Sequence, residues 1–164
     1  MVISNKQNKK DLIELNDLNQ SFELIDLNIT GNELSKNKYD ILVFYSEYNL
    51  TINQSILYGY LNCLKINRFE GTVGTLKIPG GAFELPLLTS KIIRKYSPKL
   101  CLVVGCIIKG ETQHYEFLSS TVTNAIRNVS FENNTPILNG ILTVENEQQA
   151  IDSCLLYTSP SPRD

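Results

Sequence analysis

Four long apolar runs divide the chain from residue 40 onward. Each run is bounded by polar residues, a pattern that is typical of strands buried on both faces of a parallel sheet. The runs are DILVFYS at 40–46, TVGTLKI at 72–78, LCLVVGCII at 100–108 and PILNGILT at 136–143. They predict four parallel strands.

Helical periodicity fills the segments between these runs. Apolar side chains recur at helical spacing in residues 50–67, which predicts an amphipathic helix. A second helix is expected to begin near Phe83 with Pro86 in its first turn, and a third near Thr112. Strands that alternate with helices predict an α/β fold, namely a three-layer α/β/α sandwich with a four-stranded parallel sheet, doubly wound and flavodoxin-like.

The first 39 residues differ from the rest in composition. They are rich in Asn, Lys, Asp and Glu and hold one short apolar alternation, SFELIDLNI at 21–29. We interpret residues 1–39 as a weakly ordered N-terminal arm with one strand and no catalytic residue. The 164-residue chain is then expected to have one folded domain, residues 40–153.

Composition and charge narrow the class of protein. The chain is 42% hydrophobic and 20% charged with a net charge of -2, which argues against a disordered chain and against a nucleic-acid partner. No apolar stretch has the length of a membrane span, and no signal peptide is recognisable. Four scattered cysteines and a single histidine, with no CxxC pair, predict reduced thiols, a cytoplasmic location and no metal site.

Polar and aromatic residues gather where the predicted strands end. The first three strands are followed by SEYN at 46–49, PGGAFE at 79–84 and KGETQH at 109–114. Doubly wound sheets bind ligands beyond the carboxyl ends of their strands. We therefore expect these three segments to meet at one edge of the sheet and to form a site there.

His114 is the only histidine of the chain, and imidazole is the commonest side chain for proton transfer. Its place near a helix start disfavours the imidazolium, so we expect a neutral group that can act as a general base. The same helix start contains Gly110, Glu111 and Thr112, whose free backbone amides favour an anion such as phosphate. The alternatives are a surface histidine without a chemical role and a plain helix cap.

The other two segments offer groups for a flat, hydroxylated ligand. Two glycines in PGGAFE allow the backbone to approach a ligand closely, and Glu84 can accept hydrogen bonds from hydroxyl groups. Tyr48 can stack on a heterocycle. The alternatives are a favourable helix N-terminal charge for Glu84, a core position for Phe83 and a half-buried surface position for Tyr48.

These segments resemble the motifs of lumazine synthases. That family carries an aromatic residue followed by Asn after the first strand, P-G-(A/S)-(F/W)-E-(I/L)-P after the second, G-x-T-x-H after the third and G-(I/L)-L-T on the fourth. Here they read Tyr48-Asn49, PGGAFELP at 79–86, GETQH at 110–114 and GILT at 140–143. Residues 40–153 as a whole are similar to this family.

The resemblance implies a reaction of riboflavin biosynthesis that needs no cofactor. It condenses 5-amino-6-(D-ribitylamino)uracil with 3,4-dihydroxy-2-butanone 4-phosphate to 6,7-dimethyl-8-ribityllumazine. Tyr48 would stack on the pyrimidinedione, His114 would move protons, and Asn139 would approach the ring from a neighbouring subunit. The other implied contacts are Ala82, Phe83 and Glu84 with the ribityl chain, Cys106, Ile107 and Ile108 with the ring, and Glu111 and Thr112 with the phosphate.

The resemblance also implies an assembly of several copies. Family members form homo-oligomers, either pentamers or icosahedral shells of sixty subunits, and riboflavin synthase is a candidate partner. Their N-terminal arm adds a strand to a neighbour's sheet, a role that residues 21–29 could fill.

The resemblance ends at residue 153. Where the family has an Arg that binds the substrate phosphate, this chain has Ser153, and CLLYTSPSPRD follows at 154–164. We interpret residues 154–164 as a non-native or disordered tail, similar to translated sequencing-adapter DNA, so that the domain lacks the end of its last helix. The missing Arg favours an alternative, a catalytically impaired shell protein that binds a lumazine or a flavin. A generic nucleotide binder is disfavoured because no GxxxxGK(S/T) or GxGxxG segment follows a strand.

Overall fold

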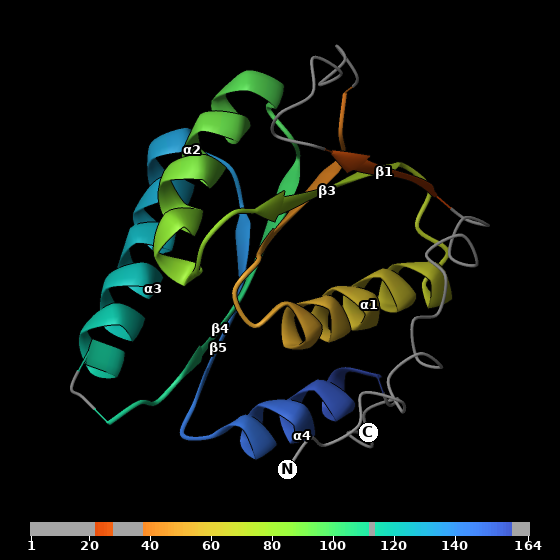
Figure 1. Ribbon diagram of the computed structural model, residues 1–164. Coiled ribbons are helices and arrows are strands. Elements are labelled where there is room, and N and C mark those ends of the chain that lie inside the picture. Colours follow the sequence, from red (N-terminus) through yellow and green to blue (C-terminus); the bar gives the residue numbers. More distant parts are fainter. Residues whose placement is uncertain (1–21, 28–37, 112–113, 159–164) are drawn as a thin grey trace.

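A parallel sheet lies between two layers of helices (Figure 1). The structure is a computed structural model that describes residues 22–27, 38–111 and 114–158. The strands are β1 (Glu23–Leu27), β2 (Ile41–Ser46), β3 (Thr72–Ile78), β4 (Leu100–Ile108) and β5 (Ile137–Val144). They pair in the order β1-β3-β2-β4-β5, and each pair is parallel. The predicted three-layer α/β/α class is confirmed, but the sheet has five strands and the predicted number of four is wrong.

The fifth strand comes from the segment interpreted as an arm. β1 pairs with residues 72–76 of β3, in the sheet of its own chain. Phe22 packs against Phe69 with their ring centroids 6.3 Å apart, and Leu27 is buried in the core. The apolar alternation therefore covers an edge of β3 that would otherwise be unpaired.

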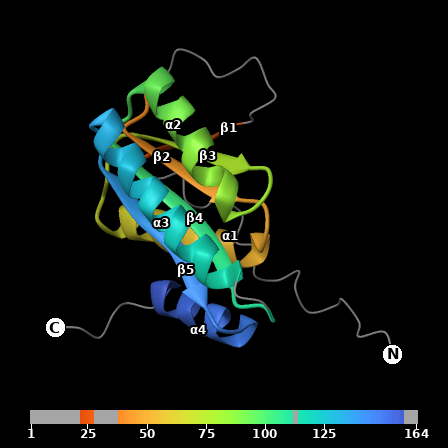
Figure 2. The ribbon, with the colours of Figure 1, turned by 90° about the vertical axis from the view of Figure 1, so that its left-hand side faces the viewer.

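The helices cover both faces of this sheet. On one face lie α1 (Leu50–Ile66) and α4 (Glu147–Thr158), and on the other lie α2 (Leu85–Tyr96) and α3 (His114–Asn133), which Figure 2 shows side by side across the strands. A short 3-10 helix, η2 (Ala82–Glu84), leads into α2, which has Pro86 in its first turn as expected. No helix in the described ranges has the length and apolar character that a membrane crossing needs.

The last helix enters the segment interpreted as a tail. α4 continues to Thr158, and Cys154 is buried against α1 with its Sγ 3.6 Å from the carbonyl oxygen of Ile52. Residues 159–164 lie outside the described part of the chain. The interpretation of residues 154–164 as a non-native or disordered tail stays a prediction.

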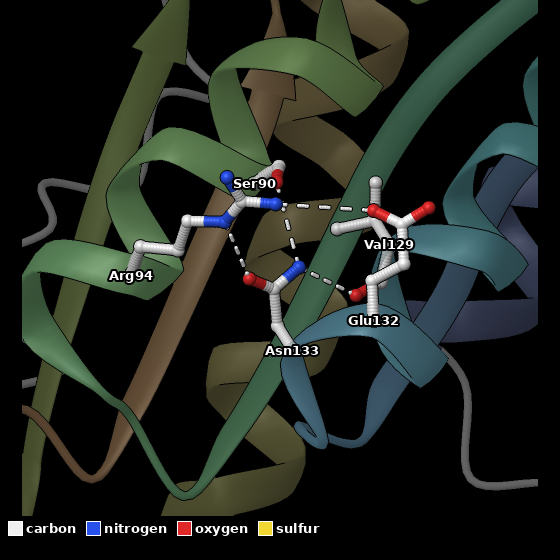
Figure 3. Close-up of polar contacts among 5 residues, drawn as sticks. All are labelled: Ser90, Arg94, Val129, Glu132 and Asn133. Carbon is white, nitrogen blue, oxygen red and sulfur yellow. Dashed lines mark hydrogen bonds and ion pairs between the residues drawn. The ribbon is translucent and has the colours of Figure 1, made fainter.

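Apolar packing against both faces of the central strands holds the layers together. All six residues of β2 are buried, which is the pattern predicted for a strand covered on both sides. The helices α2 and α3 are also joined by polar contacts near their C-terminal ends (Figure 3). Arg94 Nε donates across the pair to Asn133 Oδ1 at 3.0 Å, and within α3 Asn133 Nδ2 donates to the carbonyl of Val129 at 2.7 Å. These contacts fix the helix pair at the end remote from the carboxyl ends of the strands.

Candidate active site

A cavity lies where the chain changes its direction across the sheet. β2 lies between β3 and β4, so the sheet extends from β2 first toward one edge and then toward the other, and doubly wound folds bind ligands at such a point. The cavity measures about 550 Å³. Its lining residues are Tyr48, Gly81, Ala82, Phe83, Cys106, Ile107, Ile108, Gly110, His114, Tyr115 and Leu118.

Most of the site residues predicted from the sequence meet in this cavity. They come from the turn after β2, the turn after β3, the end of β4 and the start of α3, and they are Tyr48, Ala82, Phe83, Cys106, Ile107, Ile108 and His114. The segments after the first three predicted strands therefore do meet at one edge of the sheet.

Two aromatic rings stand open at the cavity. Tyr48 is 70% exposed and Phe83 is 63% exposed, so the core position considered for Phe83 is wrong and Tyr48 is more exposed than a half-buried surface residue. Exposed aromatic side chains in a concave site offer flat apolar surfaces on which a ring can stack.

The turn that carries Tyr48 is fixed by its neighbour in sequence. Asn49 has φ 59° and ψ 40°, a left-handed conformation that Asn tolerates better than most residues. Its side-chain Nδ2 donates to the carbonyl oxygen of Cys106 at 3.0 Å. The hydrogen bond ties the β2–α1 turn to the end of β4, where Cys106 lines the cavity.

The glycine turn after β3 closes on itself. Gly80 has φ +96°, a conformation that favours glycine, and its carbonyl accepts a hydrogen bond from the amide of Tyr48 at 2.9 Å. The amide of Gly81 donates to Glu84 Oε2 at 2.7 Å. Glu84 is exposed and does not line the cavity, and its carboxylate caps this turn through the hydrogen bond to Gly81.

The segment after β4 brings His114 to the cavity. His114 is exposed and begins α3, while Glu111 is exposed outside the lining and Thr112 falls outside the described residues. Lys109 Nζ lies 3.6 Å from Glu145 Oε1, and both side chains are exposed. An exposed pair of this kind is weak, so the amine of Lys109 is available to another anion.

The end of β4 brings the uncharged side chains of Cys106, Ile107 and Ile108 to the cavity. Burial, with a smaller effect of Cys154, raises the pKa of the Cys106 thiol to about 11, so the thiol is protonated at neutral pH and is not a nucleophile. Within the described ranges, no group of three or more His, Cys, Asp or Glu residues could hold a metal ion. The two exposed rings can stack on a flat ligand, and His114 lines the same cavity.

Two predicted residues lie away from the cavity of their own chain. Asn139 is exposed in the edge strand β5, where its Oδ1 accepts a hydrogen bond from the amide of Ile141 at 3.0 Å. Ser153 lies in α4 on the opposite face of the sheet, and its Oγ donates to the carbonyl of Gln149 at 2.8 Å. Neither side chain lines the cavity.

Comparison with known proteins gives this arrangement a family. Residues 38–157 match the family model described as 6,7-dimethyl-8-ribityllumazine synthase. A 6,7-dimethyl-8-ribityllumazine synthase of Buchnera aphidicola subsp. Baizongia pistaciae is 38% identical over 122 residues, 72% of this chain and 75% of that protein. The chain belongs to the lumazine synthase family. Proteins of the same name from Prochlorococcus marinus (strain MIT 9312) and Clostridium kluyveri (strain ATCC 8527) are 33% and 35% identical, over 74% and 70% of this chain and 80% and 73% of their own lengths.

Three residues of this lumazine synthase fold were missed as parts of the site. Tyr115 and Leu118 line the cavity, although their spacing on α3 predicts only a helix face turned to the core. Asn53 is fully buried in α1, where it contacts the turn that carries Tyr48. Its position among polar residues of an amphipathic helix gave no signal of burial, because burial here depends on the turn that folds back over it.

Proposed function

We propose that this cavity is the active site of a 6,7-dimethyl-8-ribityllumazine synthase. Family membership supplies the reaction, in which 5-amino-6-(D-ribitylamino)uracil and 3,4-dihydroxy-2-butanone 4-phosphate condense with loss of phosphate and water. One observation carries the assignment to the cavity: two exposed aromatic rings and the histidine that begins α3 line the same space at the switch point of the sheet. No cofactor takes part in the proposed reaction.

The aromatic end of the cavity would hold the ribitylaminouracil. Tyr48 would stack on the pyrimidinedione, and the backbone of residues 106–108 would meet the edge of the ring. Ala82, Phe83 and Glu84 would hold the ribityl chain. The exposure of Tyr48 supports this role, as does the 2.7 Å hydrogen bond between Glu84 and Gly81, which keeps a carboxylate beside the cavity where ligand hydroxyls can replace the amide.

The start of α3 would hold the butanone phosphate. Glu111 and Thr112 would present backbone amides and a hydroxyl to the phosphate, because unpaired amides at a helix start bind anions. Lys109, paired only weakly with Glu145, would supply positive charge. Ser153, at the position where the family has an arginine, carries no charge. We therefore expect it to bind phosphate more weakly than an arginine would.

His114 would move protons during phosphate elimination and ring closure. It lines the cavity at the first residue of α3, together with the rings of Tyr48 and Phe83. General acid–base help of this kind contributes roughly 10²- to 10⁴-fold to a rate.

A second copy of the chain would complete the site. Asn139 is exposed on the edge strand β5 beside Leu138, which is 45% exposed, and neither lines the cavity of its own chain. An exposed edge of this kind is available to a neighbouring subunit. We propose a homo-oligomer, a pentamer or an icosahedral shell, with riboflavin synthase as a candidate partner. The proposed cytoplasmic location rests on the four cysteines, which are free.

We further propose that residues 154–164 are not native. The composition of that segment, rather than its conformation, supports this reading, since α4 continues through residue 158. Sequencing the source gene across codon 153 tests it directly. We expect an arginine codon at position 153, followed by codons that extend the last helix. An authentic stop codon after codon 164 would contradict the proposal.

The experiment for the function follows lumazine absorbance and phosphate release together. We expect the chain to form lumazine and to release phosphate in step, and His114→Ala to slow both by roughly 10²-fold or more while lumazine still binds. Binding of lumazine without phosphate release would favour the alternative, a binding or shell protein. Absence of both binding and turnover would reject the site itself.

A further inference from the structure

Asn53 lies entirely inside the protein, directly beneath the turn that carries Tyr48. It has 0% exposure, and its Nδ2 lies 2.9 Å from the carbonyl of Ser46, 2.9 Å from the Oγ of Ser46 and 2.8 Å from the carbonyl of Tyr48. The N–H groups of a single amide thus connect the last residue of β2 to the aromatic residue of the cavity. Ser46 Oγ also donates to the carbonyl of Tyr48, at 3.3 Å.

The amide oxygen of Asn53 differs from the amide nitrogen in its hydrogen bonding. In the described part of the chain, Asn53 Oδ1 is buried and has no hydrogen-bond partner. A buried acceptor without a partner lowers the stability of the folded state, and an aliphatic side chain of similar size would avoid that loss. The hydrogen bonds that the two N–H groups donate to the turn therefore explain an asparagine at this position better than a gain in overall stability does.

Further hydrogen bonds hold the turn between β2 and α1. Asn49 Nδ2 donates to the carbonyl of Cys106 at 3.0 Å, and the amide of Tyr48 donates to the carbonyl of Gly80 at 2.9 Å. The backbone of Tyr48 is thus held at its N–H by the turn after β3 and at its carbonyl by Asn53. With both peptide groups fixed, the exposed ring has only its side-chain rotations left.

We infer that Asn53 is a positioning residue that holds the ring of Tyr48 in place for the pyrimidinedione. The inference rests on the proposed function, because it assigns a purpose to the position of a ring that stacks on that substrate. Asn53 touches no substrate atom itself. Its effect passes through the carbonyl of Tyr48. Its hydrogen-bond partners among the described residues are Ser46 and Tyr48, both in the segment that ends β2 and forms the following turn.

The test is a double-mutant cycle between Asn53 and Tyr48 in the full chain. Asn53→Leu removes the donors at similar volume, and Asn53→Ser is a smaller second variant in case the first folds poorly. Each is made with Tyr48 and with Tyr48→Ala, and KM is measured for both substrates. Leu61→Ala is the matched control, because Leu61 is also fully buried in α1 but has no part in the turn.

We expect the Asn53 variants to raise KM for ribitylaminouracil about five- to thirtyfold, within the range of a lost stacking contact. KM for the butanone phosphate should change less than about twofold, and so should every KM in Leu61→Ala, whatever its melting temperature. In the Tyr48→Ala background the Asn53 variants should add less than about a further twofold, since the ring they position is gone.

Each other outcome overturns a different claim. Equal effects of the Asn53 variants in both backgrounds, or the same KM increase in Leu61→Ala, would overturn the positioning role and leave the proposed function standing. Identical KM values for the unchanged chain and Tyr48→Ala, or no turnover in the unchanged chain, would overturn the proposed use of the Tyr48 ring and the inference that rests on it.

Discussion

Two adjacent glycines in the turn after β3 should respond in opposite ways to the same substitution. Gly80 has φ +96°, and a Cβ added to it would lie 2.7 Å from Glu84 Oε2. Gly81 has φ -103°, and a Cβ there would lie 3.8 Å from the same oxygen and 3.9 Å from the Cβ of Tyr48. Gly80→Ala is thus strained and crowded, whereas Gly81→Ala makes ordinary contacts.

The expected cost at Gly80 has two parts. Holding a residue other than glycine in a sparsely populated backbone conformation costs about 1–3 kcal/mol. The carboxylate of Glu84 must also leave its 2.7 Å hydrogen bond to the Gly81 amide, which adds about 1 kcal/mol because the group is exposed. The sum is about 2–4 kcal/mol, and for a chain of this size it corresponds to a fall in melting temperature of about 4–16 °C.

Thermal unfolding by circular dichroism measures both variants against the unchanged chain. We expect Gly80→Ala to melt at the lower temperature and Gly81→Ala to stay within about 2 °C of the original, since a substitution without strain changes stability little. In a Glu84→Ala background, where the hydrogen bond to Gly81 is already lost, Gly80→Ala should cost only the backbone part, about 1–3 kcal/mol. Equal melting temperatures for the two alanine variants, or a larger loss at Gly81, would refute the geometry assigned to this turn.

Other predictions concern acid stability, thiol reactivity and the core. The ion pair with Lys99 lowers the pKa of Asp40. The ionised carboxylate therefore stabilises the folded chain above the ordinary pKa of 3.8, and this stabilisation is lost as pH falls through the lowered pKa. In Asp40→Asn the free energy of unfolding should depend less on pH in this acid range. The exposed Cys63 should react with a thiol reagent at pH 8 well before Cys106, whose pKa is raised to about 11; mass spectrometry of labelled peptides gives the order, and prior labelling of Cys106 would contradict it. Thr89→Val removes a buried hydroxyl without a partner among the described residues, so the melting temperature should stay level or rise by up to about 3 °C, and a clear fall would contradict it.

The layered fold can be predicted from local patterns of apolar residues in the sequence. β2 and β4 are continuous apolar runs, and in the structure both are buried on both faces. The convergence of Tyr48, Phe83 and His114 on one cavity follows from their positions after successive parallel strands. Neither conclusion requires knowledge of side-chain packing.

The remaining features depend on contacts between distant segments. The pairing of β1 with β3 was not predictable, because a short strand with an apolar alternation fits an edge of its own sheet as well as an edge of a neighbour's. The burial of Asn53 requires the turn above it. Asn139 lies on an edge strand outside the cavity of its own chain, so the role proposed for it depends on a second copy of the chain.

The most direct test of the proposed site is a crystal structure of the chain with 6,7-dimethyl-8-ribityllumazine bound. We predict that the ring of the product stacks on Tyr48, that its ribityl chain lies along Phe83 and Glu84, and that His114 lies within hydrogen-bond reach of the ring or of an anion beside it. Product bound anywhere else on the chain, or stacked on no aromatic residue of this cavity, would contradict the site on which the proposed function rests.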